Sequence, residues 1–132
     1  MQIFQDTMKF DEHNIQVACV RWFYTNPQTK TLLLFSVPNG AKFAGSQRQR
    51  ASQWKRLEKE GCLAGTPDLQ LCHPAGDYHG LFIEMKTPKG RQSKTQALFE
   101  QRALDAGYGY AICRSLEEFI DTVQGYIEHG KF

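Results

Sequence analysis

The sequence predicts an α/β domain built on a mixed central sheet of about four strands flanked by helices. Three observations predict it. Segments with helical spacing of apolar residues alternate with short apolar runs, which gives the element order α-β-α-β-β-α-β-α. The length of 132 residues suits one domain, so we expect residues 1–132 to form a single unit. The composition, 41% hydrophobic and 23% charged, excludes a disordered chain, collagen and a coiled coil.

The first part of the chain is expected to hold two helices and one strand. Apolar residues at helical spacing predict a helix over 11–24. A short apolar run predicts a strand over 32–37, closed by a Pro-Asn-Gly turn at 38–40. A polar stretch of good helix formers predicts a helix over 46–60, and Gly61 suits the left-handed position that follows a helix.

Two capping patterns place the last two helices. Ser93 followed by Gln96 has the form of a capping box, so a helix is expected from there to residue 107. Ser115 with Glu118 repeats the pattern and starts the final helix. The segment 108–114 between them reads as a strand.

The runs 68–72 and 81–86 predict a hairpin that gathers charged groups. Alternation along the second strand places Glu84 and Lys86 on one face. Antiparallel pairing would bring Asp68, near the start of the first strand, close to both of them. Two carboxylates beside a lysine suit an oxygen-ligated divalent cation that also contacts a phosphate. The alternative is an ordinary cross-strand salt bridge on a solvated face.

The same residues carry a resemblance to a known family. Proline-aspartate, a gap, then Glu-x-Lys is the signature of the PD-(D/E)XK nuclease superfamily, and the chain resembles its VRR-NUC branch, the virus-type replication-repair nucleases. The similarity extends over most of the chain, through G-T-P-D-L at 65–69, I-E-M-K at 83–86, S-K-T-Q at 93–96 and A-G-Y at 106–108. It implies a restriction-endonuclease-like core and metal-dependent cleavage of DNA.

The resemblance also implies a role for each residue of the site. Asp68, Glu84 and the backbone carbonyl of Met85 would bind Mg²⁺ or Mn²⁺. Lys86 would be the catalytic lysine. Glu12 in the first helix would complete the metal site directly or through water, and Gln96 would support the active site.

Two of these residues can also be judged without the family. Glu12 lies three residues before Ile15 on the apolar stripe, where a carboxylate needs a partner or a metal. Alternatively it is a favourable charge in the first turn of a helix. Gln96 is either half of the capping box or part of the site, and both roles are compatible.

Basic residues flank the carboxylates and are expected to bind the phosphate backbone of DNA. The segment 42–61 holds six cations against two anions, although the net charge of the chain is only +2. Any one of these residues would otherwise be part of a solvated face. No element that reads bases is evident, so we expect structure-selective cleavage. The candidate DNA-binding residues are Lys42, Arg48, Arg50, Lys55, Lys89, Arg91 and Lys94.

Further expectations concern partners and cofactors. The resemblance implies a homodimer acting on branched or junction DNA, and a phage origin. The segment 90–95 lacks P-loop spacing, so no nucleotide cofactor is expected. Cys62, Cys72, His73 and His79 match no zinc spacing and are read as core cysteines and loop histidines. No membrane span or signal peptide is apparent, which favours the bacterial or phage-infected host cytoplasm.

Two alternatives to a nuclease remain from the sequence. One is a DNA-binding accessory module that keeps the fold and the basic flanks but does not cut. The other is an α/β domain in which the motif is accidental. Asp68-dependent metal binding would separate the last from the nuclease.

Overall fold

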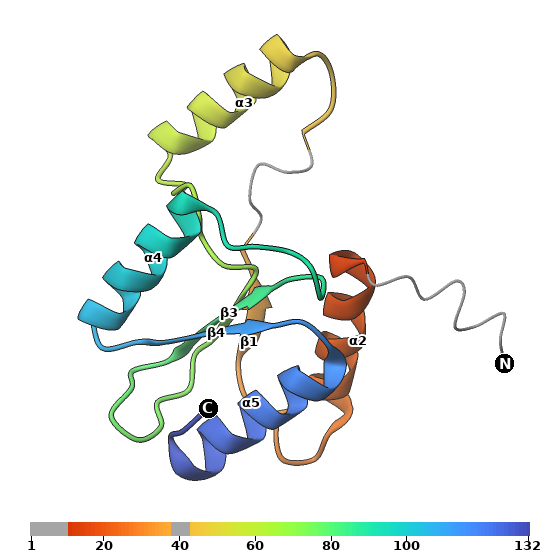
Figure 1. Cartoon of the computed structure of the whole chain (residues 1–132), viewed down its shortest axis with the longest axis vertical. Coiled ribbons are helices and arrows are strands. Elements are labelled where there is room, and N and C mark those ends of the chain that lie inside the picture. The colour runs from red at the N-terminus through yellow and green to blue at the C-terminus, as the bar shows by residue number, and fades with distance from the viewer. Residues whose placement is uncertain (1–10, 38–42) are drawn as a thin grey trace, which may run out of the picture.

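A computed structural model describes residues 11–37 and 43–132, and its element order is the predicted one (Figure 1). The helices are α2 (Glu12–Thr25), α3 (Gln47–Lys59), α4 (Lys94–Asp105) and α5 (Leu116–His129). The strands are β1 (Leu34–Ser36), β2 (Leu69–Leu71), β3 (Leu81–Met85) and β4 (Gly109–Cys113). The strands end one or two residues short of the predicted limits. The turn expected at 38–40 lies outside the described residues.

The four strands form one mixed sheet in the order β1-β2-β3-β4. The predicted hairpin is confirmed, since β2 and β3 are antiparallel with Leu69 opposite Ile83 and Leu71 opposite Leu81. Strands β3 and β4 are parallel, as a connection through α4 allows. Strand β3 is therefore internal, with a neighbouring strand on each side.

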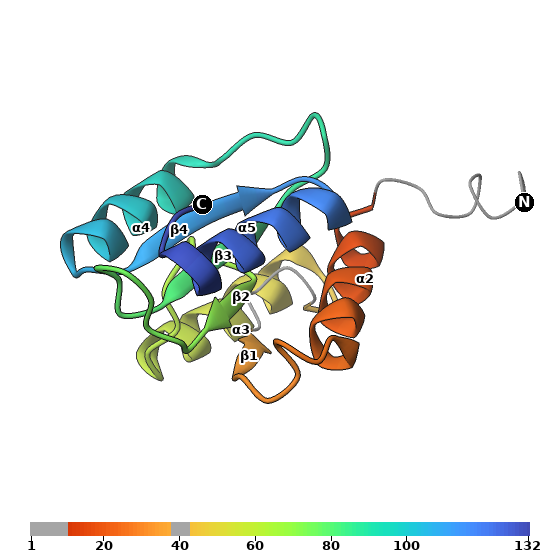
Figure 2. The same ribbon diagram turned by 90° about the horizontal axis from the view of Figure 1, so that it is seen from below.

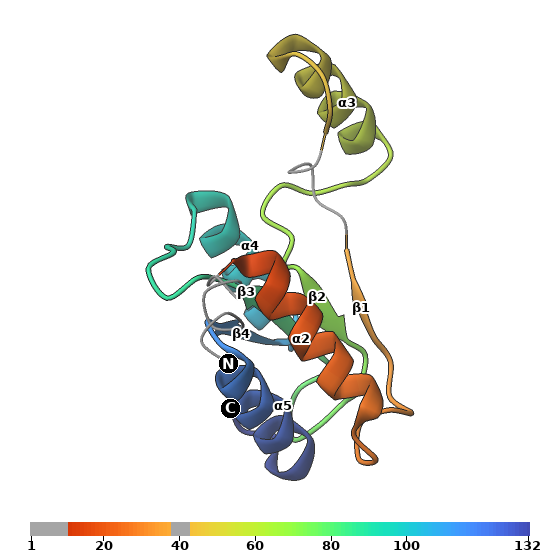
Figure 3. The same ribbon diagram turned by 90° about the vertical axis from the view of Figure 1, so that its right-hand side faces the viewer.

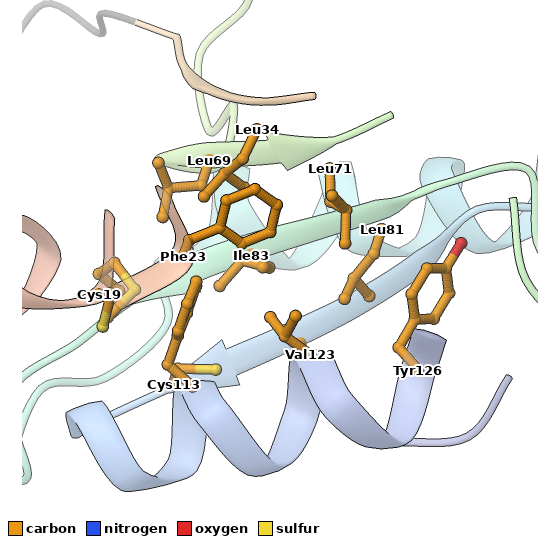
Figure 4. Packing of buried hydrophobic residues seen from close by; sticks show 13 residues of the cluster. Cys19, Phe23, Leu34, Leu69, Leu71, Leu81, Ile83, Cys113, Val123 and Tyr126 are labelled. Atoms are coloured by element: carbon orange, nitrogen blue, oxygen red, sulfur yellow. The ribbon is translucent and has the colours of Figure 1, made fainter. Parts of the chain in front are cut away.

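Helices cover both faces of the sheet, as predicted (Figure 2). On one face, residues of α2 and α5 pack with Leu81, Ile83 and Met85 of β3 in a single apolar cluster, part of which Figure 4 shows. On the other face, the Phe82 ring meets Phe99 of α4 edge-on, with centroids 5.0 Å apart. Alternate residues of β3 thus contact opposite layers.

Helix α3 is an exception, because it projects from the body instead of covering the sheet (Figures 1 and 3). It has no buried residue. Its ends are set locally: Ser46 and Gln49 form a capping box, and Gly61 adopts φ +107° at the C-terminal end. The Cys62 amide donates to the Leu57 carbonyl there, as in a Schellman motif. The sequence predicted the helix but not its separation from the sheet.

The two predicted capping boxes have different outcomes. The one at Ser93 and Gln96 is confirmed, with both reciprocal bonds present. At Ser115, only the serine half forms, because its hydroxyl accepts from the Glu118 amide. The Glu118 carboxylate instead accepts from the Arg114 amide, one residue earlier. The prediction of a second capping box was therefore wrong for one of its two bonds, the one from the Ser115 amide to the Glu118 carboxylate.

The cysteines are free, and two of them belong to the core. Burial raises the pKa of Cys19 to about 12 and that of Cys113 to about 11, so both thiols stay protonated at neutral pH. Cys62 is half-buried, whereas Cys72 is exposed and is not the core residue we expected. In the described part of the chain, no helix combines the length and apolar character needed to cross a membrane.

Candidate active site

The hairpin brings Asp68 and Glu84 together at one end of the sheet. One register step beyond Leu69 and Ile83, these two residues face each other across β2 and β3. The Asp68 carboxylate accepts a hydrogen bond from the backbone amide of Met85 at 2.8 Å. This bond fixes the aspartate against the strand that carries the glutamate.

Glu84 is unusual because its carboxylate is almost completely buried, with only 2% of the residue exposed. Its Oε1 accepts a hydrogen bond from Gln96, whereas no donor among the described residues reaches its Oε2; a hydrogen bond to Asp68 is open to the carboxyl only in its protonated form. Burial raises the pKa of Glu84 from 4.5 to about 9; the charge of Asp68 adds to the effect, and Lys86 opposes it. An isolated protein would therefore hold this group protonated at neutral pH.

Gln96 has both of the roles that the sequence left open. Its Oε1 accepts from the Ser93 amide and so completes the cap of α4. Its Nε2 donates to Glu84 Oε1 at 3.0 Å. One side chain thereby connects the start of α4 to the buried carboxylate.

These groups share the wall of a cavity of about 950 Å³ with residues of α2. Glu12, Asp68, Glu84, Lys86 and Gln96 all line it, so every predicted residue whose side chain was implicated is brought to one place. Glu12 lies in the first turn of α2 and is exposed, so the expectation that its place on the apolar stripe demands a partner was wrong. Its position suits both proposed roles, a favourable charge at the helix start and a residue on the wall of the cavity.

The donor groups of this site fit a divalent metal ion. A buried carboxylate oxygen without a donor, next to a second carboxylate in the wall of a cavity, is the arrangement that a hard divalent cation would satisfy. Over residues 11–37 and 43–132, no three His, Cys, Asp or Glu side chains are grouped to hold a metal. The direct carboxylate ligands available are therefore two, Asp68 and Glu84.

The basic residues form two exposed groups. Arg48, Arg50 and Lys55 lie on α3, while Lys89, Arg91 and Lys94 lie between β3 and the first turn of α4. Lys42 lies outside the described residues. The one ion pair found among the described residues joins His129 to Glu128, so these cations have no acidic partner there.

Two structural residues near the site were not found from the sequence. Arg114 donates to the carbonyls of Thr87 and Gly90, at 2.8 and 2.6 Å, and so holds the loop that follows Lys86. Gly65 has φ +85°, and a Cβ there would lie 2.3 Å from the carbonyl oxygen of Thr95. Both contacts join segments more than 20 residues apart, and only the glycine of the G-T-P-D segment gave a local signal.

The mixed sheet, with a carboxylate pair, a lysine and a glutamine around one end of β3, defines a nuclease-like α/β domain. Residues 11–117 match the family described as the VRR-NUC domain, and the chain belongs to that family. A solved structure titled VRR_NUC domain protein has the same fold, with a TM-score of 0.70 and 24% sequence identity over 92% of this chain and 91% of the other. No curated protein matches the chain. The expected family and fold are confirmed.

Proposed function

We propose that the chain is a metal-dependent, structure-selective DNA endonuclease that hydrolyses phosphodiester bonds in branched DNA during replication, recombination or repair. The observation that carries the proposal is the buried Glu84 carboxylate, which lies beside Asp68 in the wall of the cavity and has no donor to its Oε2. Burying such a group without a partner is costly, so its retention indicates a ligand. Membership of the VRR-NUC family supports a nuclease.

Each residue of the site has a role in this proposal. Asp68, Glu84 and the Met85 carbonyl would hold Mg²⁺ or Mn²⁺, and Glu12 would act through a bridging water. A bound divalent cation supplies Lewis acidity and lowers the pKa of a coordinated water. Gln96 holds the Glu84 carboxylate in place through its hydrogen bond.

Lys86 is the cation of this cavity that lies next to the strand carrying Glu84, and it is suited to the developing negative charge. It is half-buried and follows Met85 directly, and its backbone amide donates to the Cys113 carbonyl at 3.0 Å. The base of its side chain is thus fixed by the parallel pairing of β3 with β4. An ammonium held there would orient the attacking water or stabilise charge on the phosphoryl oxygens.

The basic groups on α3 and on the loop after β3 would bind DNA through its phosphates. Their exposure and lack of acidic partners in the described part of the chain leave them available. Phosphate contacts carry no sequence information, which supports selection of DNA by shape. We also propose a homodimer, since two sites related by a two-fold axis suit paired cuts in a four-way junction.

The test is cleavage of labelled single-stranded, duplex, flap and four-way-junction DNA with Mg²⁺, with Mn²⁺ and with chelator. Asp68→Ala and Lys86→Ala are expected to abolish cleavage while leaving folding and DNA binding largely intact. Asp121→Asn, a change at an exposed carboxylate of α5, is the matched control and should cut normally. Full activity of either site variant would refute the mechanism, and binding without any cutting would favour an accessory module.

A further inference from the structure

A second cavity, of about 480 Å³, lies between the projecting helix α3 and the start of α4. Trp54 and Phe43 give it aromatic walls, and Arg50 gives it a cation. Polar groups of Gln47, Ser93 and Thr95 complete its lining. Aromatic faces combined with a cation and hydrogen-bonding groups are the surroundings that an unpaired nucleotide prefers.

Trp54 has no evident structural purpose in the fold. It lies on a helix without buried residues, and it is not part of the apolar core cluster or of the partly buried residues packed against it. The other tryptophan, Trp22, instead packs edge-on against Phe119 beneath the sheet. A half-buried indole that lies outside the core cluster and borders two cavities is available to a ligand.

The charge around this cavity suits a polyanion. Helix α3 carries five cations and one anion, so its net charge is +4. A third cavity also borders Trp54; Glu60, Thr66, Gln70 and apolar groups line it, and it has no cation. Charge complementarity therefore favours the second cavity over the third as a place for DNA.

The second cavity also adjoins the proposed active site. Gln96 lines both cavities, and its Nε2 donates to Glu84. Gly65 and Thr95 both line the second cavity beside Gln96, and their backbones lie so close together that no side chain fits between them. A DNA strand with a phosphate at Glu84 would thus have a neighbouring nucleotide within reach of Trp54.

We infer that this second cavity binds an unpaired nucleotide of the DNA substrate, with its base stacked on Trp54 and its phosphate near Arg50. The inference rests on the proposed nuclease function and extends it to substrate choice. A paired base cannot leave its stack without cost, so the cavity favours strands that are already open. Flaps supply such nucleotides next to a cut, whereas blunt duplex does not.

The first experiment measures the affinity of the full chain, in chelator to prevent cutting, for a fluorescein-labelled oligothymidylate and for a blunt duplex. Trp54→Ala should weaken oligothymidylate binding about 5- to 100-fold and duplex binding less than about twofold. Trp54→Phe, which keeps a stacking ring, should restore most of the affinity. Leu98→Ala, a truncation of an exposed apolar residue on α4, is the matched control and should bind normally.

A second experiment changes the DNA instead of the protein. Oligonucleotides carrying an abasic site at each position in turn should bind the wild type more weakly when that site falls at Trp54. This loss should disappear in Trp54→Ala, so impaired folding of the variant cannot produce the result. An equal loss on oligothymidylate and duplex, or no abasic effect, would overturn the inference.

The same data separate the inference from the proposed function. If the wild type cuts and Asp68→Ala does not, while Trp54→Ala binds every DNA normally, the nuclease stands and the nucleotide pocket is refuted. If the folded wild type neither binds nor cuts any DNA, both are refuted. A change of sedimentation in Trp54→Ala without a change in DNA affinity would assign the cavity to a second copy of the chain and overturn the inference.

Discussion

Replacing Glu84 by glutamine should stabilise the metal-free protein, because it removes a buried ionisable group without changing its shape. The pKa of Glu84 is raised to about 9 in the folded chain, from 4.5 for an ordinary glutamate. Between these values the folded chain holds a proton that the unfolded chain has lost. The stability of the wild type therefore falls as pH rises from about 4.5 to about 9, and Glu84 imposes no cost on folding below about pH 4.5.

The size of the effect follows from the same two values. Each pH unit within the window removes about 1.4 kcal/mol of folding free energy. At pH 7 the cost of Glu84 is thus about 3 kcal/mol, close to the ordinary penalty for burying an unpaired polar group. Glutamine can still accept from Gln96 and has no charge to desolvate. For a chain of this length, the gain corresponds to a melting temperature about 10 °C higher.

The assay is thermal unfolding followed by circular dichroism in chelator at pH 5, 6, 7 and 8. The wild type should lose stability relative to Glu84→Gln as pH rises, whereas Asp121→Asn should follow the wild type. Taking the difference between variants removes every contribution that they share. Mn²⁺ should then raise the melting temperature of the wild type at pH 8 more than that of Glu84→Gln. Parallel pH curves, or a less stable Glu84→Gln at pH 8, would refute the reasoning.

Three further predictions test contacts around the site. Gly65→Ala should lower the free energy of unfolding in urea by about 3 kcal/mol, because it combines left-handed strain with a clash against Thr95. Gly61→Ala, at φ +107° in open space, should lower it by about 1 kcal/mol. Equal losses would contradict the close approach of Gly65 to Thr95. Gln96→Ala and Ser115→Ala should each lose about 1 kcal/mol of helix capping, but only Gln96→Ala should lower the cleavage rate by about tenfold or more. Similar cleavage rates in the two variants would show that Gln96 has no part in the chemistry. Arg114→Lys should speed amide hydrogen exchange in the loop 87–90, because lysine cannot donate to both carbonyls, whereas the exposed Arg102→Lys should leave it unchanged. Unchanged exchange in Arg114→Lys would show that the loop is stable without these two hydrogen bonds.

Local patterns were sufficient for most of the fold and for the centre of the site. The hairpin that joins Asp68 to Glu84 follows from two short apolar runs, because antiparallel pairing and side-chain alternation leave few arrangements. The cap at Ser93 was equally readable, since its two bonds lie within four residues. The cap at Ser115 was not, because Glu118 had a choice between two neighbouring amides and only the backbone conformation decides between them.

What the sequence by itself determined is the order of the elements, the pairing of β2 with β3 and the charged groups that this pairing gathers. These depend on hydrophobic periodicity and on contacts between neighbouring segments. Only the tertiary structure decided that Glu84 is buried with no donor to its Oε2 and that Gln96 both caps α4 and donates to Glu84. It also decided that α3 projects beside a second cavity. Each of these depends on packing between segments that are distant in the chain. Glu84 is buried only when those segments pack together, and its burial raises its pKa.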